Sequence, residues 1–199
     1  SDDELIRPGS SIESMARLNP SFEALGAQGS DELLCKSFPE VDHIPHHHHP
    51  GNSPGMVDGA SLALLATGEM AASLGLPVRA EIIGFSSKRA AAIEGLTGGY
   101  AAAKDVLERT GIAGEDIDLW EFNEGFAATA MNFSKQLDVP LDRYNVNGGG
   151  IAMGHAMGAT GVNILGMMID ELERRKKHTG LIAISGAAGA GAAMIVKIN

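Results

Sequence analysis

One fifteen-residue stretch constrains the fold of this chain more than any other. It runs from Asn147 to Gly161 and reads NGGGIAMGHAMGATG, with three consecutive glycines and then a histidine that follows a glycine. Glycine lets a backbone adopt positive φ or approach a ligand closely. A helical pattern follows, so the stretch predicts a turn that presents His155 at the start of a helix. The alternative interpretation is a tight turn in which the histidine has no function.

In the rest of the chain, segments with the hydrophobic spacing of a strand alternate with segments that have the spacing of a helix. This order indicates an α/β fold. The last two strands leave no room for a helix between them, so we expect them to pair antiparallel. A short apolar run, Ala60–Ala66, is expected to be a buried strand. The expected strands are Arg79–Phe85, Ile117–Phe122, Tyr144–Val146, Leu181–Ile184 and Ala192–Ile198, and the expected helices are Thr67–Gly75, Ala101–Thr110, Ala127–Leu137 and Ala159–Arg175.

The first 56 residues differ from the remainder because they hold six of the eight prolines. A short amphipathic helix is expected near Ser11–Leu18, with Ser10 or Ser11 as its cap. Elsewhere this region lacks periodic apolar stretches, so we expect irregular or extended structure and no independent domain.

Composition limits the compartment and the partners. The formal charge of −10 disfavours nonspecific binding to nucleic acid or to an anionic membrane. Cys35 is the only cysteine, which excludes an intrachain disulfide and fits a reducing compartment. The acidic start of the sequence does not resemble a signal peptide, and its apolar runs are shorter than a membrane span. We therefore expect a cytoplasmic protein with no membrane and no nucleic acid among its partners.

Four segments, in the same order, resemble the thiolase family. Asn147–Gly161 is similar to the family's histidine signature, and Asn123-Glu124-Gly125-Phe126 to its Asn-Glu-Ala-Phe loop. Ser185–Gly191 lies where thiolases carry a cysteine and then a glycine-rich run. Gly51–Gly55, followed by Asp58-Gly59-Ala60, resembles the segment that closes the first half of a thiolase.

The resemblance implies a thiolase-like layered fold, with a mixed five-stranded sheet and helices on both faces. Residues 1–56 would be a Pro-rich loop region, 57–75 the end of the N-terminal half, and 76–199 the C-terminal domain. The family's nucleophilic cysteine belongs to the N-terminal half, which this sequence does not contain. Cys35 lies outside any matching motif, so we expect a separate chain or a missing segment to supply the nucleophile, and a homo- or hetero-oligomer.

The resemblance also assigns roles to residues. His155 would activate the nucleophile and bind a thioester oxygen, which suits a group that titrates near neutral pH. Asn123 would hold a water that completes an oxyanion hole; its alternative role is an N-cap for the following helix. Ser185 would stand where the family's second cysteine moves the α-proton. The further expected contacts are the backbone of Gly186 and Ala187 at a second oxyanion site, and Ser53, Gly154 and Phe126 at the substrate or coenzyme A.

The implied function is acyl transfer between coenzyme A thioesters, which forms or cleaves a 3-ketoacyl-CoA. A serine hydroxyl is far less acidic than a thiol, whose pKa is about 8.5, so Ser185 departs from the family's proton shuttle. Pro54 and Ala156 are further departures. The alternatives are therefore a catalytically silent acyl-CoA-binding or scaffolding subunit, or other thioester chemistry on the same fold. No cofactor is expected beyond coenzyme A and acyl-CoA as substrates.

Two other patterns do not predict binding sites. His43 and His46–His49 lack the spacing of a folded metal site and have no accompanying cysteine or carboxylate cluster, so no metal is expected. The glycines of Gly186–Gly191 have the wrong order for a dinucleotide fingerprint, and a strand follows them.

Overall fold

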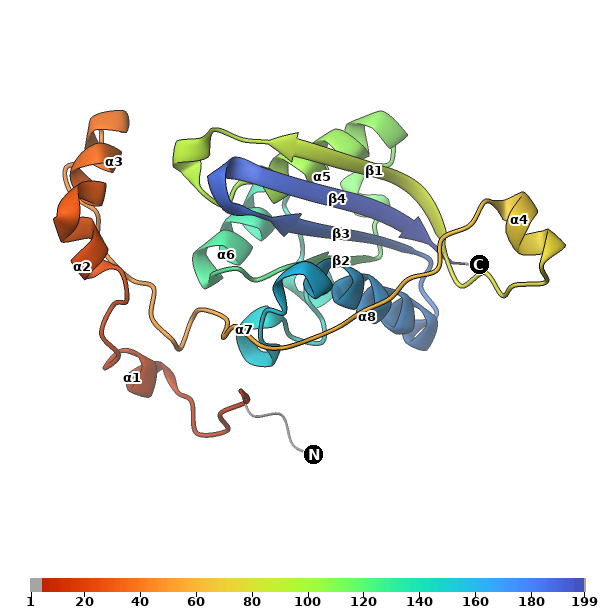
Figure 1. Ribbon diagram of the computed structural model, residues 1–199, viewed down its shortest axis with the longest axis horizontal. Coiled ribbons are helices and arrows are strands. Elements are labelled where there is room, and N and C mark those ends of the chain that lie inside the picture. The colour runs from red at the N-terminus through yellow and green to blue at the C-terminus, as the bar shows by residue number, and fades with distance from the viewer. Residues whose placement is uncertain (1–4, 199) are drawn as a thin grey trace.

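The computed structural model describes residues 5–198, which form a mixed four-stranded sheet with helices on both faces (Figure 1). The strands lie in the order β1-β4-β3-β2. They comprise β1 (Glu81–Arg89), β2 (Leu119–Phe122), β3 (Thr179–Ser185) and β4 (Ala190–Lys197). β2 pairs parallel with β3, whereas β4 pairs antiparallel with both β3 and β1. The predicted α/β class and the antiparallel final pair are confirmed.

The prediction of a fifth strand at Tyr144–Val146 is wrong in detail. The backbone of this segment forms an isolated parallel bridge between Tyr144 and Trp120, not a continuous strand. The reason is Asn145, which has a left-handed backbone with φ of 44°. Its side chain accepts a hydrogen bond from the N–H of Phe122 at 2.8 Å and donates one to the carbonyl of Phe122 at 3.0 Å. An amide side chain thus takes the place of a strand along part of this edge.

The two faces of the sheet are covered by different helices. α5 (Gly98–Thr110) and α6 (Ala127–Gln136) pack on one face, and α8 (Thr160–Arg175) packs on the other. Side chains alternate along β2 accordingly, since Phe122 joins the α5–α6 cluster and Leu119 joins the α8 cluster. Phe122 stacks on Phe133 of α6 with ring centroids 4.3 Å apart.

Local sequence signals account for the helix ends. α5 ends at Gly111, whose φ of 69° is left-handed. α8 ends with Arg174 and Arg175 in its last turn, where cations oppose the negative end of the helix dipole. α4 (Gly68–Ser73) is capped by Thr67, whose hydroxyl accepts from the N–H of Met70 at 3.2 Å, as predicted.

Two expectations for the first 75 residues are corrected. Ala60–Ala66 is extended but not a buried strand: Leu62 is 95 % exposed, Leu64 79 % and Leu65 69 %. The region predicted to be irregular contains two helical stretches within Glu23–Ser37, because each has helix formers such as Ala24 and Leu25 or Glu32 and Leu33. They meet at a kink at Gly29, whose φ is 112°. The elements here are α1 (Ile12–Met15), capped by Ser11, α2 (Glu23–Leu25), the kinked segment Gly26–Ser30 and α3 (Asp31–Ser37).

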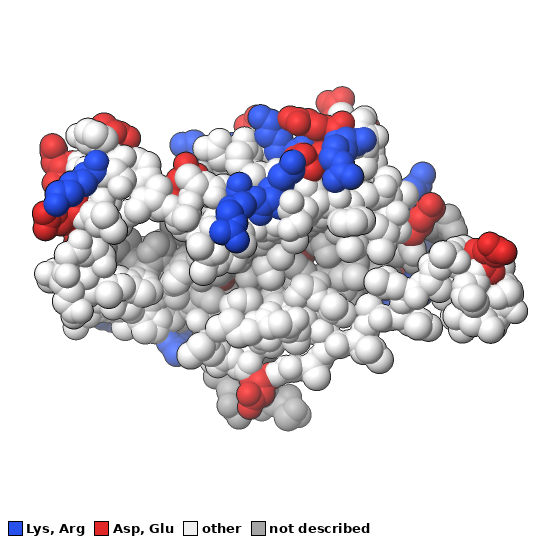
Figure 2. Space-filling model, turned by 45° about the horizontal axis from the view of Figure 1, so that its top comes forward, with Lys and Arg blue, Asp and Glu red and all other residues white. Residues whose placement is uncertain are grey.

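Charge is unevenly distributed over the surface. In Figure 2 the charged side chains gather along one edge, and much of the remaining visible face is uncharged. An ion pair joins β1 to α5, since Lys88 lies 2.7 Å from Asp105, and Arg109 pairs with the same carboxylate within α5 at 3.5 Å. Within residues 5–198, no helix is long and apolar enough to cross a membrane, and no group of three or more His, Cys, Asp or Glu side chains is placed to hold a metal ion.

The start of α5 lies unusually close to β4. A Cβ added to Gly191 would lie 1.9 Å from the carbonyl carbon of Gly98, and one added to Gly98 would lie 2.2 Å from the oxygen of Gly189. Backbone on both sides leaves no flexible side chain to move aside. These glycines therefore permit the contact that brings the first turn of α5 against the end of β3.

We expect Gly191→Ala to lower the free energy of unfolding by about 1–3 kcal/mol, because the methyl group must push α5 off the sheet. Urea denaturation monitored by circular dichroism measures the loss. Gly166→Ala in α8 is the matched control, since a Cβ there meets nothing within 4 Å. Equal stability of the two variants would contradict the packing described.

Candidate active site

The candidate site lies at the carboxyl ends of β2 and β3. Asn123 directly follows β2 and Ser185 is the last residue of β3. Because the two strands are parallel neighbours, their ends meet at one edge of the sheet, where α/β folds commonly bind ligands. The N–H of Asn123 donates to the carbonyl of Ala183 at 3.0 Å, which extends the ladder to the site itself.

Asn123 has an exceptional environment. Its side chain is 3 % exposed, and neither Oδ1 nor Nδ2 has a hydrogen-bond partner among residues 5–198. A buried amide without a partner costs about 1–3 kcal/mol, so such a group points to a water or ligand position. The alternative role as N-cap of α6 does not apply, since the cap residue is Phe126, whose N–H donates to the hydroxyl of Thr129 at 3.3 Å.

His155 follows the short helix α7 (Gly150–Met153) in the glycine-rich loop. Its Nδ1 lies 2.8 Å from the hydroxyl oxygen of Thr160, the buried first residue of α8. The backbone N–H of His155 donates to the carbonyl of Gly55 at 2.8 Å. Partial burial lowers the pKa of the imidazole from its ordinary value, which favours the neutral ring that can accept a proton.

The glycine before the histidine is required by the backbone. Gly154 has φ of 91°, and a Cβ there would lie 2.5 Å from a methyl carbon of Val57. The segment after Gly55 therefore passes directly against the histidine loop, with Met56 bridged to His155. The structure therefore places Gly154 against Val57, and its predicted contact with substrate or coenzyme A stays a prediction.

Ser185 lies against the first turn of α5. Its Oγ accepts a hydrogen bond from the N–H of Gly99 at 2.8 Å, and a Cβ on Gly99 would lie 2.7 Å from this oxygen. The hydroxyl group thus meets a backbone donor at the positive end of a helix. Its proton remains free to be donated, because the nitrogen supplies the hydrogen of this bond.

The two backbone donors predicted after Ser185 differ in availability. The N–H of Gly186 donates to the carbonyl of Ala190 at 2.7 Å, so it is already used within the β3–β4 turn. The neighbouring Ala188 has a left-handed backbone with φ of 55°. Of the predicted pair, the N–H of Ala187 has no backbone acceptor among residues 5–198 and is the one a ligand oxygen can use.

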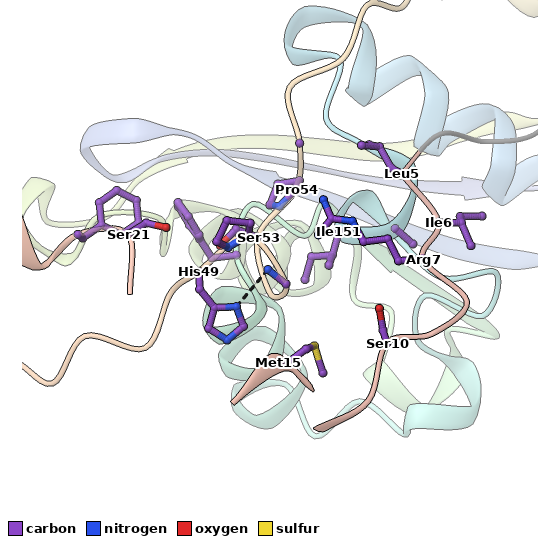
Figure 3. Close-up of a pocket in the computed structure, with 16 residues that line it drawn as sticks. Leu5, Ile6, Arg7, Ser10, Met15, Ser21, His49, Ser53, Pro54 and Ile151 are labelled. Carbon is purple, nitrogen blue, oxygen red and sulfur yellow. Dashed lines mark hydrogen bonds between the residues drawn. The ribbon is translucent and has the colours of Figure 1, made fainter. Parts of the chain in front are cut away.

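A cavity of about 550 Å³ lies between the first residues described and the segment from His49 to Gly55 (Figure 3). Ser53 and Phe126, both predicted to contact substrate, line it, whereas Asn123, His155 and Ser185 do not. Sequence reasoning missed the wall formed by Leu5, Ile6, Arg7, Met15 and Phe22, since nothing in that segment's pattern marks a binding surface. Phe126 also packs edge-on against His48, with ring centroids 4.8 Å apart.

A buried carboxyl group near the site was also missed. Glu121 is 5 % exposed, and burial, together with the charge of Glu124, raises its pKa to about 8. Burial and the same carboxylates raise the pKa of Tyr144 above its ordinary value. The sequence signal was available, because Glu121 interrupts an otherwise apolar strand.

Comparison with known proteins places the chain in a family. A family model described as "Thiolase, C-terminal domain" matches residues 76–198. The acetyl-CoA acetyltransferase of Thiocystis violacea is 35 % identical over 98 % of this chain and 44 % of its own length, and the 3-ketoacyl-CoA thiolase of Alcanivorax borkumensis is 34 % identical over 98 % and 46 %. The chain belongs to the thiolase family, and it spans less than half the length of these relatives.

Solved structures agree with this assignment. The crystal structure of the Bacillus anthracis acetyl-CoA acetyltransferase matches with a TM-score of 0.83 and 30 % identity, covering all of this chain and 45 % of that one. Human mitochondrial 3-ketoacyl-CoA thiolase matches with a TM-score of 0.80 and 25 % identity over 99 % of this chain and 45 % of that one. The predicted thiolase-like fold is therefore confirmed, with a sheet of four strands and not five.

The environment of Ser185 predicts how a thiol would behave there. In a Cys35→Ser background, we expect Ser185→Cys to have a thiol pKa below the ordinary value of about 8.5, because the N–H of Gly99 and the α5 dipole favour the thiolate. The pH dependence of iodoacetamide alkylation measures it, with wild-type Cys35 as the reference. A pKa at or above that of Cys35 would show that burial outweighs these donors.

Glu121 predicts a pH-dependent stability change. Its folded pKa of about 8 exceeds its unfolded value, so the folded state binds more protons and stability falls as pH rises between about 4.5 and 8. We expect the stabilisation gained by Glu121→Gln to grow by about 2 kcal/mol between pH 5 and pH 7. Urea titrations at both values test this, with exposed Glu108→Gln as control; a constant difference would contradict the raised pKa.

Proposed function

We propose that this chain is the C-terminal half of a thiolase-type acyltransferase, which moves acyl groups between coenzyme A thioesters and so forms or cleaves a 3-ketoacyl-CoA. The observation that carries the proposal is the buried amide of Asn123, whose two polar atoms have no partner within residues 5–198. The printed names of the matched relatives, acetyl-CoA acetyltransferase and 3-ketoacyl-CoA thiolase, support the substrate class.

In the proposed reaction, a cysteine thiolate from the N-terminal half attacks the carbonyl carbon of an acyl-CoA. The coenzyme A thiolate leaves and takes a proton, and the acyl group remains on the cysteine. His155 serves as the base that first takes the thiol proton, a role supported by its lowered pKa. Asn123, through a bound water, and the N–H of Ala187 stabilise the developing oxyanions.

Two surface features support a missing half as the partner. The extended segment Ala60–Ala66 exposes three leucines, and the segment bounds a groove of about 810 Å³ against α8. Exposed apolar surface of this kind marks an interaction site. The proposed occupant is the N-terminal half, in a separate chain or in a longer form of this one, and the proposed assembly is an oligomer.

A second candidate is a catalytically silent subunit that binds acyl-CoA or organises an assembly. Ser185 favours it, because a hydroxyl without its own activating base does not readily move the α-proton of a thioester. Other thioester chemistry that needs no such shuttle is compatible with the same site. Pro54, one of the departures from the family pattern, lines the cavity and offers no hydroxyl group to a ligand.

The acyltransferase proposal is tested on a chimera in which the N-terminal half of the Thiocystis violacea relative precedes this chain. We expect coenzyme A-dependent cleavage of acetoacetyl-CoA, and a loss of roughly 10²- to 10⁴-fold in kcat for His155→Ala, since general acid–base catalysis contributes that much. Glu108→Gln, on the exposed face of α5, is the control and should keep full activity. Unchanged turnover in His155→Ala, or no binding of acyl-CoA, would contradict the proposal.

Ser185→Cys in the same chimera distinguishes the alternatives. Gain of cleavage by the cysteine variant alone would identify a thiolase framework with one disabled group. Acyl-CoA binding without cleavage in either form would favour the binding subunit.

A further inference from the structure

Glu124 joins the two loops that carry Asn123 and His155. One carboxylate oxygen, Oε2, accepts a hydrogen bond from the N–H of Ile151 at 3.1 Å. The other, Oε1, accepts one from the side-chain amide of Asn145 at 3.3 Å. The carboxylate therefore links the end of β2, the edge segment beside it and the loop that leads to the histidine.

The glycines Gly149 and Gly150 lie close to this carboxylate and to Asn123. A Cβ added to Gly149 would lie 2.4 Å from the carboxyl carbon of Glu124. A Cβ on Gly150 would lie 3.3 Å from Oδ1 of Asn123. The loop can approach both side chains only because these two positions lack a methyl group. The close packing of the loop on Glu124 therefore requires these glycines.

Asn145 fixes the direction of the contact. Its Oδ1 accepts from the N–H of Phe122, so its Nδ2 is the atom that faces Glu124. Glu124 consequently meets a donor on each side, the amide of Asn145 and the backbone of Ile151. A carboxylate accepts from both, whereas a neutral amide in its place presents a donor to one of them.

We propose that Glu124 is a positioning residue, which clamps the histidine loop against Asn123 and so fixes the distance between the two groups. It acts through the backbone of Ile151 and the packing of Gly149 and takes no part in proton transfer. This inference deepens the proposed function, on which its catalytic meaning rests. Acyl transfer requires this spacing to be held because misplacement by about 1 Å costs roughly 10²-fold in rate.

The clamp is tested on the chain as it stands, without the missing half. Glu124→Gln removes the second acceptor, and Gly149→Ala displaces the carboxylate without altering any charge. Two nuclear magnetic resonance readouts are taken: the exchange rate of the Ile151 amide proton, and the pKa of the His155 ring, assigned by the signal missing from His155→Gln. Glu108→Gln and Gly166→Ala are the matched controls, with global stability from urea denaturation alongside.

We expect exchange of the Ile151 amide to accelerate roughly tenfold in both variants, as for loss of one hydrogen bond. The pKa of His155 should rise toward its ordinary value in both, because a looser loop is less buried. Loss of the Glu124 charge alone would shift this pKa downward, so a rise in Glu124→Gln reports the loop and not the charge.

Unchanged exchange at Ile151 and an unchanged or lowered pKa of His155 would overturn the clamp. The same holds if both readouts change only in proportion to a global loss of stability, because Glu124 would then be an ordinary structural residue. Neither result depends on acyl-CoA, so failure of the clamp and failure of the proposed acyl transfer can be distinguished.

Discussion

The parallel pairing of β2 with β3 is the constraint on which the rest of the site depends. It aligns the carboxyl ends of two strands whose sequences end at Asn123 and Ser185, and the pairing continues through the N–H of Asn123 to the carbonyl of Ala183. α5 and α6 cover one face of the sheet and α8 covers the other, so different groups reach the carboxyl ends of β2 and β3 from the two faces. The first turn of α5 meets Ser185, and the loop before α8 meets Asn123.

Close backbone contact is the second constraint on the site. Three positions in different elements are glycine because another group occupies the space of a side chain: Gly191 against α5, Gly99 against Ser185 and Gly149 against Glu124. The last two contacts involve a polar side chain, and the first brings the turn of α5 that donates to Ser185 against the sheet. These three glycines therefore permit the close approach of helices and loops to the sheet edge.

The sequence predicted those elements whose signals are local. Thr67 and Gly111 marked helix ends correctly because capping depends on neighbouring backbone groups. The strand predicted at Tyr144–Val146 is absent because of a tertiary contact, in which the side chain of Asn145 bonds to the backbone of Phe122. Local hydrophobic spacing does not encode such a contact. Ala60–Ala66 has the composition of a buried strand, yet its leucine side chains are exposed among residues 5–198, because no other element of the described chain covers them. Likewise the motif predicted where His155 and Asn123 lie, whereas the cavity wall near Met15 and Phe22 arises from long-range packing.

The central claim is that this chain supplies His155 and the oxyanion donors to a thiolase-type site whose nucleophilic cysteine lies elsewhere. Intact mass spectrometry of the native protein isolated from its source, before and after exposure to acetyl-CoA, tests this most directly. We expect a complementary N-terminal half, either as a second polypeptide or within a longer chain, with one cysteine that becomes acetylated. A stable species of this chain alone, unmodified by acetyl-CoA, would contradict it.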